Sequence, residues 1–283
     1  MNAPDKYKVY AIPKRKQGYR LIAQPSRELK HYQRQLQDFI IFPKHKCAMA
    51  YRKGLSIKNN ALSHVNNSYL LKLDLENFFN SITPDLFWSV WSRTWSLPSK
   101  EDQLFLEKLI FWRFHGSLIL SVGAPSSPSI SNFCMYYFDN EVEAICTKMK
   151  ITYTRYADDL TFSSNVKNIL FEIPVLIENI LNEQFKGLLR LNSSKTIFSS
   201  KAHNRHVTGI TLNNNGKISL GRDRKRYIKH KVHLYTLGML DATELNHLKG
   251  MITFARFIEP AFFKSLEMKY NSNVIFRLTQ EKI

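Results

Sequence analysis

Two adjacent aspartates, Asp158 and Asp159, lie between two short segments in which apolar and polar residues alternate. Such alternation is typical of β-strands, so we expect the pair at a tight hairpin turn where both side chains can face one point. Aspartate is also common in turns for a structural reason, because its side chain bonds nearby backbone N–H groups. The pair by itself therefore leaves a structural and a functional explanation open.

A third acid, Asp74, ends an apolar segment that indicates a buried strand. A charge in that place costs free energy unless it is paired or binds a metal. Asp74, Asp158 and Asp159 together form the carboxylate set of two-metal phosphoryl transfer, in which ions about 3.5–4 Å apart stabilise the attacking and leaving oxygens. We predict a site for two Mg²⁺ ions, with Mn²⁺ as an alternative. Asp74 and Asp158 would bridge the ions, Asp159 would support them, and the backbone carbonyl of Leu75 would be a further ligand.

The composition favours a polyanionic partner. The 283 residues include 41 Lys and Arg against 23 Asp and Glu, which gives a net charge of +18. Such an excess points to nucleic acid or to an acidic membrane surface. Charged residues interrupt the longest apolar stretch, at 104–122, and the N-terminus has no apolar signal-peptide core, so we expect no membrane association. The three scattered cysteines suit reduced thiols, and we expect a cytoplasmic protein.

The hydrophobic periodicity predicts a mixed order of strands and helices, which indicates an α+β fold. Strands are expected at 9–12, 20–23, 68–74, 151–155, 160–163, 207–212 and 217–220. Helices are expected at 26–40, 78–95, 101–114, 129–150, 165–185 and 222–237, with a kink or break at Pro174.

The acidic motifs resemble the palm of reverse transcriptases, in which an apolar strand ends in Asp-x-x-x-x-Phe and a Tyr-Ala-Asp-Asp turn follows later. Other segments in the expected order resemble the fingers and the nucleotide-binding loop: Ile12–Arg15, Tyr19–Ile22, Pro25, Gly123–Pro128, Ile130–Asn132 and Leu191–Thr196. Together the motifs cover most of residues 7–220. The resemblance implies a right-hand polymerase fold, with fingers and palm in residues 1–205 and a small helical thumb in residues 206–283.

Two further motifs resemble those of bacterial retron enzymes. Asn60-Ala61-Leu62-Ser63-His64 is similar to the retron Asn-Ala-x-x-His signature, and Val207-Thr208-Gly209 matches the retron Val-Thr-Gly triplet. The resemblance implies a structured noncoding RNA as template and primer, branched RNA-linked single-stranded DNA as product, and an effector protein as partner in antiphage defence. Two alternatives stay open: a non-retron reverse transcriptase, and an inactive polymerase-fold module that binds RNA or an effector.

The resemblance also assigns roles around the incoming dNTP. Phe79 would stack under the sugar and exclude a ribose 2′-hydroxyl, and Lys14 and Arg20 would bind the triphosphate. Lys195 would protonate the pyrophosphate leaving group. The loop at Gly123 and Ala124 would also contact the nucleotide. Val122 stands where the family often has Gln, which puts fidelity or nucleotide preference in question.

RNA contacts are expected from two regions. In retron enzymes the two short motifs are associated with recognition of the cognate RNA, which implies this role for Asn60, His64, Val207, Thr208 and Gly209. A strongly basic segment with helical spacing is a candidate thumb helix that would track phosphates, although a charged helix is often only a solvated face. Its cations are Arg222, Arg224, Lys225, Arg226, Lys229 and Lys231.

Overall fold

A computed structural model describes residues 3–13 and 18–280 of the chain. The chain forms two compact units, the first made of residues 1–56 and 67–198 and the second of residues 57–66 and 199–283. The sequence did not indicate that the segment 57–66 belongs with the C-terminal part. The expected division into fingers and palm at 1–205 and thumb at 206–283 stays a prediction.

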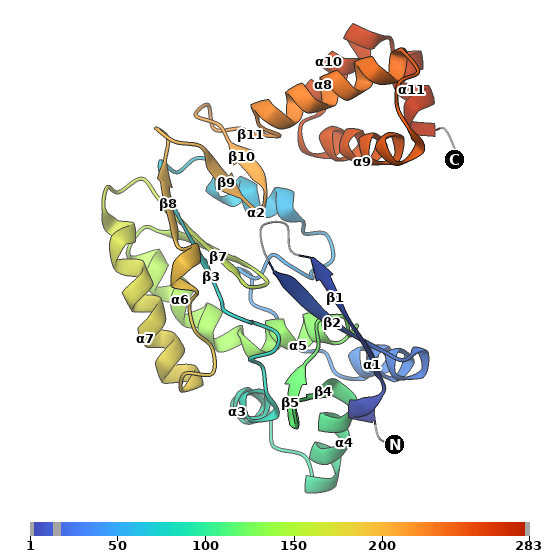
Figure 1. The fold of residues 1–283 in the computed structure, drawn as a ribbon. Coiled ribbons are helices and arrows are strands. Elements are labelled where there is room, and N and C mark those ends of the chain that lie inside the picture. The colour runs from blue at the N-terminus through green and yellow to red at the C-terminus, as the bar shows by residue number, and fades with distance from the viewer. Residues whose placement is uncertain (1–2, 14–17, 281–283) are drawn as a thin grey trace. The chain divides into compact units, whose positions relative to one another are not determined.

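The first unit is built on a four-stranded sheet of order β6-β7-β3-β8. Its strands are β3 (Tyr69–Asp74), β6 (Thr152–Tyr156), β7 (Asp159–Ser164) and β8 (Ile197–Ser200). The inner strands β3 and β7 alternate between two faces, and apolar side chains such as Leu71, Leu73 and Phe162 lie in the core. The helices α6 (Tyr136–Lys148) and α7 (Ile173–Phe185) pack against each other (Figure 1), and α6 also contacts β6.

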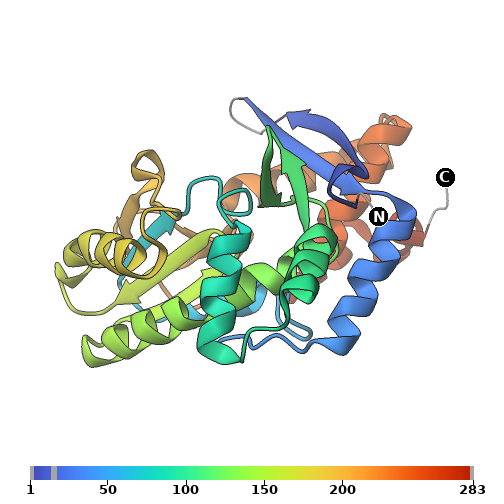
Figure 2. The same cartoon turned by 90° about the horizontal axis from the view of Figure 1, so that it is seen from below.

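Two hairpins form the N-terminal part of the same unit. β1 (Tyr7–Pro13) pairs antiparallel with β2 (Tyr19–Pro25), and β4 (Phe111–Phe114) pairs with β5 (Ser117–Leu120). They lie side by side (Figure 2), with Ala23, Trp112 and Ile119 buried between them. The helix α1 (Arg27–Phe39) begins where predicted because the Ser26 hydroxyl accepts a hydrogen bond from the Leu29 N–H.

The structure corrects several predicted helix boundaries. The expected helix 101–114 ends at Ile110, as α4 (Lys100–Ile110), because the next residues form β4. His115 and Gly116 have φ of 47° and 84° and supply the two-residue turn of that hairpin. The expected helix 78–95 begins only at Pro84, as α3 (Pro84–Thr94), where the Thr83 side chain caps it.

Two long predicted helices are each divided. The segment 129–150 forms α5 (Ser127–Cys134) and α6, with a break at Met135. The segment 165–185 is not helical before residue 169, where the short 3-10 helix η2 (Ile169–Glu172) begins, and it continues as α7. Pro174 stands in the first turn of α7, where its missing N–H costs nothing, and it marks the start of this helix rather than a kink within it. The other 3-10 helices are η1 (Ala3–Asp5) and η3 (Ser193–Lys195).

The second unit combines a small sheet with helices. α2 (Ile57–His64) packs on the strands β9 (Arg205–Val207), β10 (Ile210–Leu212) and β11 (Ile218–Ser219). The expected strand 207–212 is thus a hairpin, and Thr208 and Gly209, with φ of 45° and 79°, are its turn. The helices α8 (Arg222–Thr236), α9 (Ala242–Ile258), α10 (Pro260–Tyr270) and α11 (Ser272–Gln280) follow. Within the described part of the chain, no helix is both long and apolar enough to span a membrane.

Candidate active site

The three acids that the sequence singled out meet at one end of the sheet. Asp74 at the end of β3 is the register partner of Asp159 at the start of β7, so their Cβ atoms are about 4.5–5.5 Å apart. Asp159 also pairs with Tyr156, which leaves Ala157 and Asp158 as a two-residue turn. The structure therefore brings together two carboxylates that are far apart in sequence, with the third on the adjoining turn.

Backbone hydrogen bonds hold this arrangement. The Leu75 N–H donates to the Asp158 carbonyl at 3.0 Å, which joins the end of β3 to the turn. The Asn192 N–H donates to the Asp74 carbonyl at 2.8 Å, which fixes the segment before Lys195 against the same strand end. The peptide group that follows Asp74 is thus hydrogen-bonded through both its carbonyl and its N–H.

Nearby cations offset only part of the negative charge of the carboxylates. The pKa of Asp159 is raised to about 6 by desolvation and then by the charges of Asp158 and Asp74. The pKa of Asp158 is also raised, first by burial and further by Asp74, although Lys195 and Arg20 act in the opposite direction. Like charges at close range disfavour ionisation of the carboxyl groups, and a cation bound between them would lower their pKa values again.

One cation of the chain already contacts the set. The Lys195 Nζ lies 2.6 Å from Asp74 Oδ1, and the Asp74 side chain is only 13% exposed. Oxygen ligands from several carboxylates at one edge are the donor set that Mg²⁺ prefers. The residues present therefore fit divalent ions, which Asp74, Asp158 and Asp159 would hold with the Leu75 carbonyl.

The raised pKa of Asp159 has a consequence for stability. Its folded-state pKa of about 6 exceeds the ordinary 3.8, so the ionised carboxylate destabilises the folded protein above pH 6, and this penalty fades as the pH falls below 6. In EDTA, we expect Asp159→Asn to raise the unfolding temperature at pH 7.5 and to raise it less at pH 4.5. Thermal unfolding followed by circular dichroism measures this. Glu178→Gln, at an exposed acid on α7, is the control, and an equal gain at both pH values would contradict the expectation.

Phe79, five residues after Asp74, belongs to an aromatic group. Its ring is half-buried and makes edge contacts with Phe78 at 5.3 Å and with Tyr51 at 6.3 Å between centroids. Burial and then the charge of Asp158 raise the pKa of Tyr51, so this ring stands beside both Phe79 and the turn. Sequence reasoning missed Tyr51, because it lies in an irregular segment that no motif marks. Its φ of 60°, unusual for a bulky residue, becomes visible only in the structure.

Of the two cations predicted to bind the triphosphate, Arg20 and Lys14, the structure describes only Arg20. Arg20 is exposed on β2, close enough to the turn to lower the pKa values of Asp158 and Tyr51. Lys14 lies outside the described residues. The structure thus places one of the two predicted phosphate-binding side chains near the carboxylates.

The loop at Gly123 is attached to the first hairpin. The Ala23 N–H donates to the Val122 carbonyl at 3.1 Å, and the Ser121 hydroxyl donates to the Ala23 carbonyl. Gly123 has a φ of 131°, and a Cβ there would lie 3.1 Å from the Ala23 carbonyl oxygen. Glycine is therefore required by both conformation and space. Ala124 next to it is buried, so in this structure its small side chain packs inside the loop.

Comparison with known proteins decides the family. The model of the reverse transcriptase (RNA-dependent DNA polymerase) family matches residues 12–212. The Retron Ec83 reverse transcriptase of Escherichia coli is 47% identical over 275 residues, which are 95% of this chain and 88% of the relative. The chain belongs to the retron reverse transcriptases.

Other relatives of the same kind agree. The Retron Ec73 reverse transcriptase of Escherichia coli is 32% identical, and the alignment covers 95% of this chain and 89% of that one. The Retron Ec86 enzyme of Escherichia coli is 29% identical and is covered to 83%. The retron reverse transcriptase is thus an RNA-directed DNA polymerase with an α+β polymerase fold, and polymerases of this family use divalent metal ions.

In the retron reverse transcriptase, the two short motifs pack on each other within the second unit. The Thr208 hydroxyl in the β9–β10 turn donates to the Ile57 carbonyl at the start of α2, at 3.3 Å. Asn60, His64 and Val207 are fully buried, and burial lowers the pKa of His64 to about 3, which keeps it neutral. These three side chains are buried in this structure, and the RNA contacts expected of them stay a prediction. They shape the unit that presents the turn.

The cations of the retron reverse transcriptase's α8 fall into two groups. Lys225 pairs with Glu259 at 2.6 Å, Lys231 pairs with Glu244, and Arg224 donates to the Gly209 carbonyl at 3.2 Å. These three side chains hold the second unit together.

The other three cations of α8, Arg222, Arg226 and Lys229, are exposed. Their spacing of four and three residues places them on one face of the helix, where they form a basic stripe.

Proposed function

We propose that this enzyme binds a structured noncoding RNA and copies part of it into branched, RNA-linked single-stranded DNA, in antiphage defence with an effector protein. The observation that carries the proposal is the meeting of Asp74, Asp158 and Asp159 at one sheet end, with a cationic side chain against Asp74. The 47% identity to a retron reverse transcriptase supports the retron product over that of other reverse transcriptases.

Asp74, Asp158 and Asp159, with the Leu75 carbonyl, would hold two Mg²⁺ ions, or Mn²⁺. When bound, the ions supply positive charge to the attacking and leaving oxygens. Lys195, which is 57% exposed, would leave Asp74 once that carboxylate takes a divalent ion. Its ammonium would then be free to give a proton to the pyrophosphate leaving group.

The nucleotide would lie between the palm and the first hairpin. Arg20, with Lys14, would offset the charge of the triphosphate, and the loop at Gly123 and Ala124 would contact the base and sugar. Phe79 would lie beneath the sugar, where its ring would exclude a 2′-hydroxyl, and the Tyr51 ring makes an edge contact with it. The expected substrates are therefore dNTPs.

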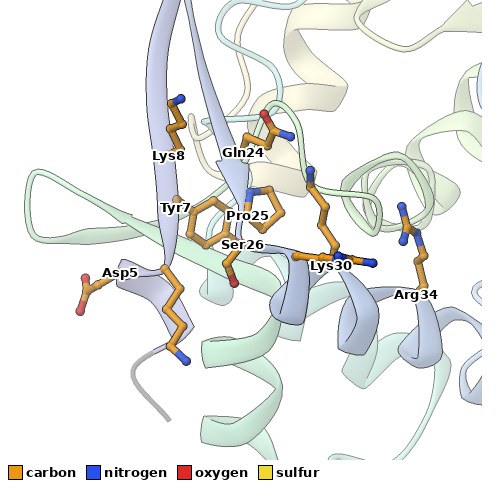
Figure 3. A pocket seen from close by; sticks show the side chains of 10 residues that line it. Asp5, Tyr7, Lys8, Gln24, Pro25, Ser26, Lys30 and Arg34 are labelled. Atoms are coloured by element: carbon orange, nitrogen blue, oxygen red, sulfur yellow. The ribbon is translucent and has the colours of Figure 1, made fainter.

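A basic cavity in the first unit supports the binding of a nucleic-acid strand. An open cavity of about 670 Å³ lies between the start of β1 and α1, and Figure 3 shows Lys8, Lys30 and Arg34 at its wall. Arg27 and Ser26 also line it, at the N-terminal end of α1. Among the described residues, none of these four cations forms an ion pair. Phosphates of a template strand would supply the missing charge.

The basic stripe on α8 is the second expected contact to phosphates. Replacing Arg222, Arg226 and Lys229 together by Gln should reduce the slope of log K for RNA binding against log salt concentration by about 2–3. The slope falls because binding releases fewer counterions when fewer phosphates are contacted. Binding of the structured RNA, measured by fluorescence anisotropy at several salt concentrations, provides the slope.

A matched control for that measurement is available on the same helix. Replacing Arg224, Lys225 and Lys231 by Gln removes the same charge from side chains that bond within the second unit. We expect this variant to lose stability and to keep the slope nearly unchanged. Equal losses of slope in both variants would mean that total charge matters and the stripe does not.

The product itself tests the proposal. The protein is expressed with the DNA that flanks its gene, and small single-stranded DNA linked to RNA is sought in wild type and in Asp158→Asn/Asp159→Asn. A DNA band that shortens after RNase treatment and is absent from the variant is the expected result. If no such band forms while the purified protein copies a supplied primer–template, the branched product is refuted. Phage plaque counts with the same pair of strains test the defence role.

A further inference from the structure

A buried ion pair lies next to the turn that carries Asp158. Arg155 of β6 and Asp139 of α6 both have fully buried side chains. The Arg155 Nε donates to Asp139 Oδ1 at 2.9 Å and Nη2 donates to Oδ2 at 2.7 Å, so the two groups meet as a fork. The Tyr153 hydroxyl donates to the same carboxylate at 2.8 Å. The carboxylate thus fixes the guanidinium in one orientation.

The remaining arm of the guanidinium reaches the turn. The Arg155 Nη1 donates to the Ala157 carbonyl at 3.1 Å. Ala157 has a φ of 58°, a left-handed conformation that a residue with a Cβ rarely adopts without support. On the other side, the Asp158 carbonyl accepts from the Leu75 N–H at 3.0 Å. The peptide carbonyls before and after Asp158 are therefore each held by a donor from a different strand.

Stability by itself does not explain this pair. Apolar residues of similar volume often stabilise a core as well as a buried ion pair does, because two charges must lose their water. What apolar residues cannot do is aim a donor at the Ala157 carbonyl. A lysine cannot do so either while it is bonded to Asp139, since its single ammonium replaces three nitrogens in a fixed plane.

We propose that Arg155 is a positioning residue: oriented by Asp139, it fixes the peptide between Ala157 and Asp158 and so sets the direction of the Asp158 carboxylate. The proposal rests on the proposed role of Asp158 as a metal ligand. No motif in the sequence indicated this role. Asp139 and Arg155 would act on the metal site indirectly, through the turn that carries Asp158.

Neighbouring contacts hold β6 from its other side. The Arg155 N–H donates to the Cys47 carbonyl at 2.8 Å, and this segment is bound to α6 through Glu143, which lies 2.7 Å from Lys46 Nζ and 3.4 Å from His45 Nε2. His45, Cys47 and Glu143 are close enough to share a metal ion. However, Lys46 already neutralises Glu143, and His45 Nδ1 accepts from the Cys47 N–H at 3.4 Å. We therefore assign this group to the support of β6.

The test replaces the whole buried network by apolar groups in the full chain, as Asp139→Leu/Tyr153→Phe/Arg155→Met. We expect a folded protein whose Mn²⁺ binding, measured by electron paramagnetic resonance of the free ion, is weaker by about 10-fold. DNA synthesis on a primed RNA template should fall by about 10- to 100-fold in kcat, with KM for dNTP nearly unchanged. If the network has a purely structural role, the folded variant should keep the Mn²⁺ affinity and the kcat of wild type.

Two further variants keep the test decisive. Ile180→Val removes a methylene from the core of α7, so it should lower stability and leave Mn²⁺ binding as in wild type. Arg155→Lys keeps the charge and should weaken Mn²⁺ binding by a few-fold. If the triple variant does not fold, this single variant tests the positioning role of Arg155. Folded variants with wild-type Mn²⁺ binding and synthesis would overturn the positioning role. If Asp158→Asn itself keeps Mn²⁺ binding and synthesis, the proposed metal site fails instead.

Discussion

Asp158→Asn lowers DNA synthesis by at least roughly 1,000-fold in the result we expect, because a neutral amide then replaces one of the carboxylates that we propose as metal ligands. Asn is close in size to Asp and fits the same turn, so the loss should come from charge and not from unfolding. The neighbouring acids cannot compensate, since the turn and β3 hold each of them in a separate place. Extension of a primer on an RNA template with Mg²⁺ measures the effect.

The control for this measurement is Glu76→Gln. Glu76 is an exposed acid two residues after Asp74, and its N–H donates to the Arg190 carbonyl. Removing its charge tests whether any negative charge near the strand end matters. Activity within a few-fold of wild type is expected for Glu76→Gln, and activity of the same order in Asp158→Asn would remove the basis for the two-metal site.

Phe79→Ala is the substitution with the second-largest expected effect, and it acts on the choice of sugar. Removing the ring opens space beneath the nucleotide, so incorporation of rNTPs relative to dNTPs should rise by about 100-fold. Incorporation of dNTPs should fall much less, because the carboxylates are unchanged. Competition between a dNTP and the matching rNTP on one template measures the ratio of kcat/KM values.

Phe78→Leu is the matched control for the sugar effect. Phe78 precedes Phe79 but is buried in the core, with only 3% of its surface exposed. Its loss should lower the unfolding temperature and leave the choice of sugar unchanged. A similar rise in rNTP incorporation in both variants would indicate a loosened palm and would refute the steric role of Phe79.

The burial of the retron motifs changes how RNA recognition should be sought. Asn60 and His64 are interior residues of the second unit. The hairpin turn at Thr208 and Gly209 reaches the surface of that unit, as do Leu62 and Ser63 of the first motif. Substitutions at His64 are therefore expected to act through the fold of this unit. Substitutions at exposed cations such as Arg222 and Arg226 should act on RNA affinity and its salt dependence.

Local sequence patterns determined much of the site. The apolar segment that ends at Asp74 and the two alternating segments around Asp158 identified three strands and a turn, because side-chain direction follows a two-residue period. Ser26 marked the start of α1, since a serine before a helix accepts an N–H that would otherwise lack a partner. The motif order also identified the family without any structure, which the match over residues 12–212 confirms.

Short apolar segments were where sequence reasoning went wrong. Phe111–Phe114 continues the helical pattern of α4, yet it forms a strand because Ser117–Leu120 is available to pair with it. A four-residue apolar run has too few turns or alternations to distinguish a helix from a strand. For the same reason, the residues of β9 and β10 at 207–212 were predicted as one strand and not as a hairpin.

Only the tertiary structure decided which distant residues meet. The register that sets Asp74 opposite Asp159, the fork from Arg155 to Asp139 and the packing of α2 on the β9–β10 hairpin all join segments that are separated along the chain. Local spacing carries no information about such contacts, because they form through packing and hydrogen bonds across the core. The sequence by itself therefore determined which residue types the chemistry needs, and tertiary packing determined what holds them in place.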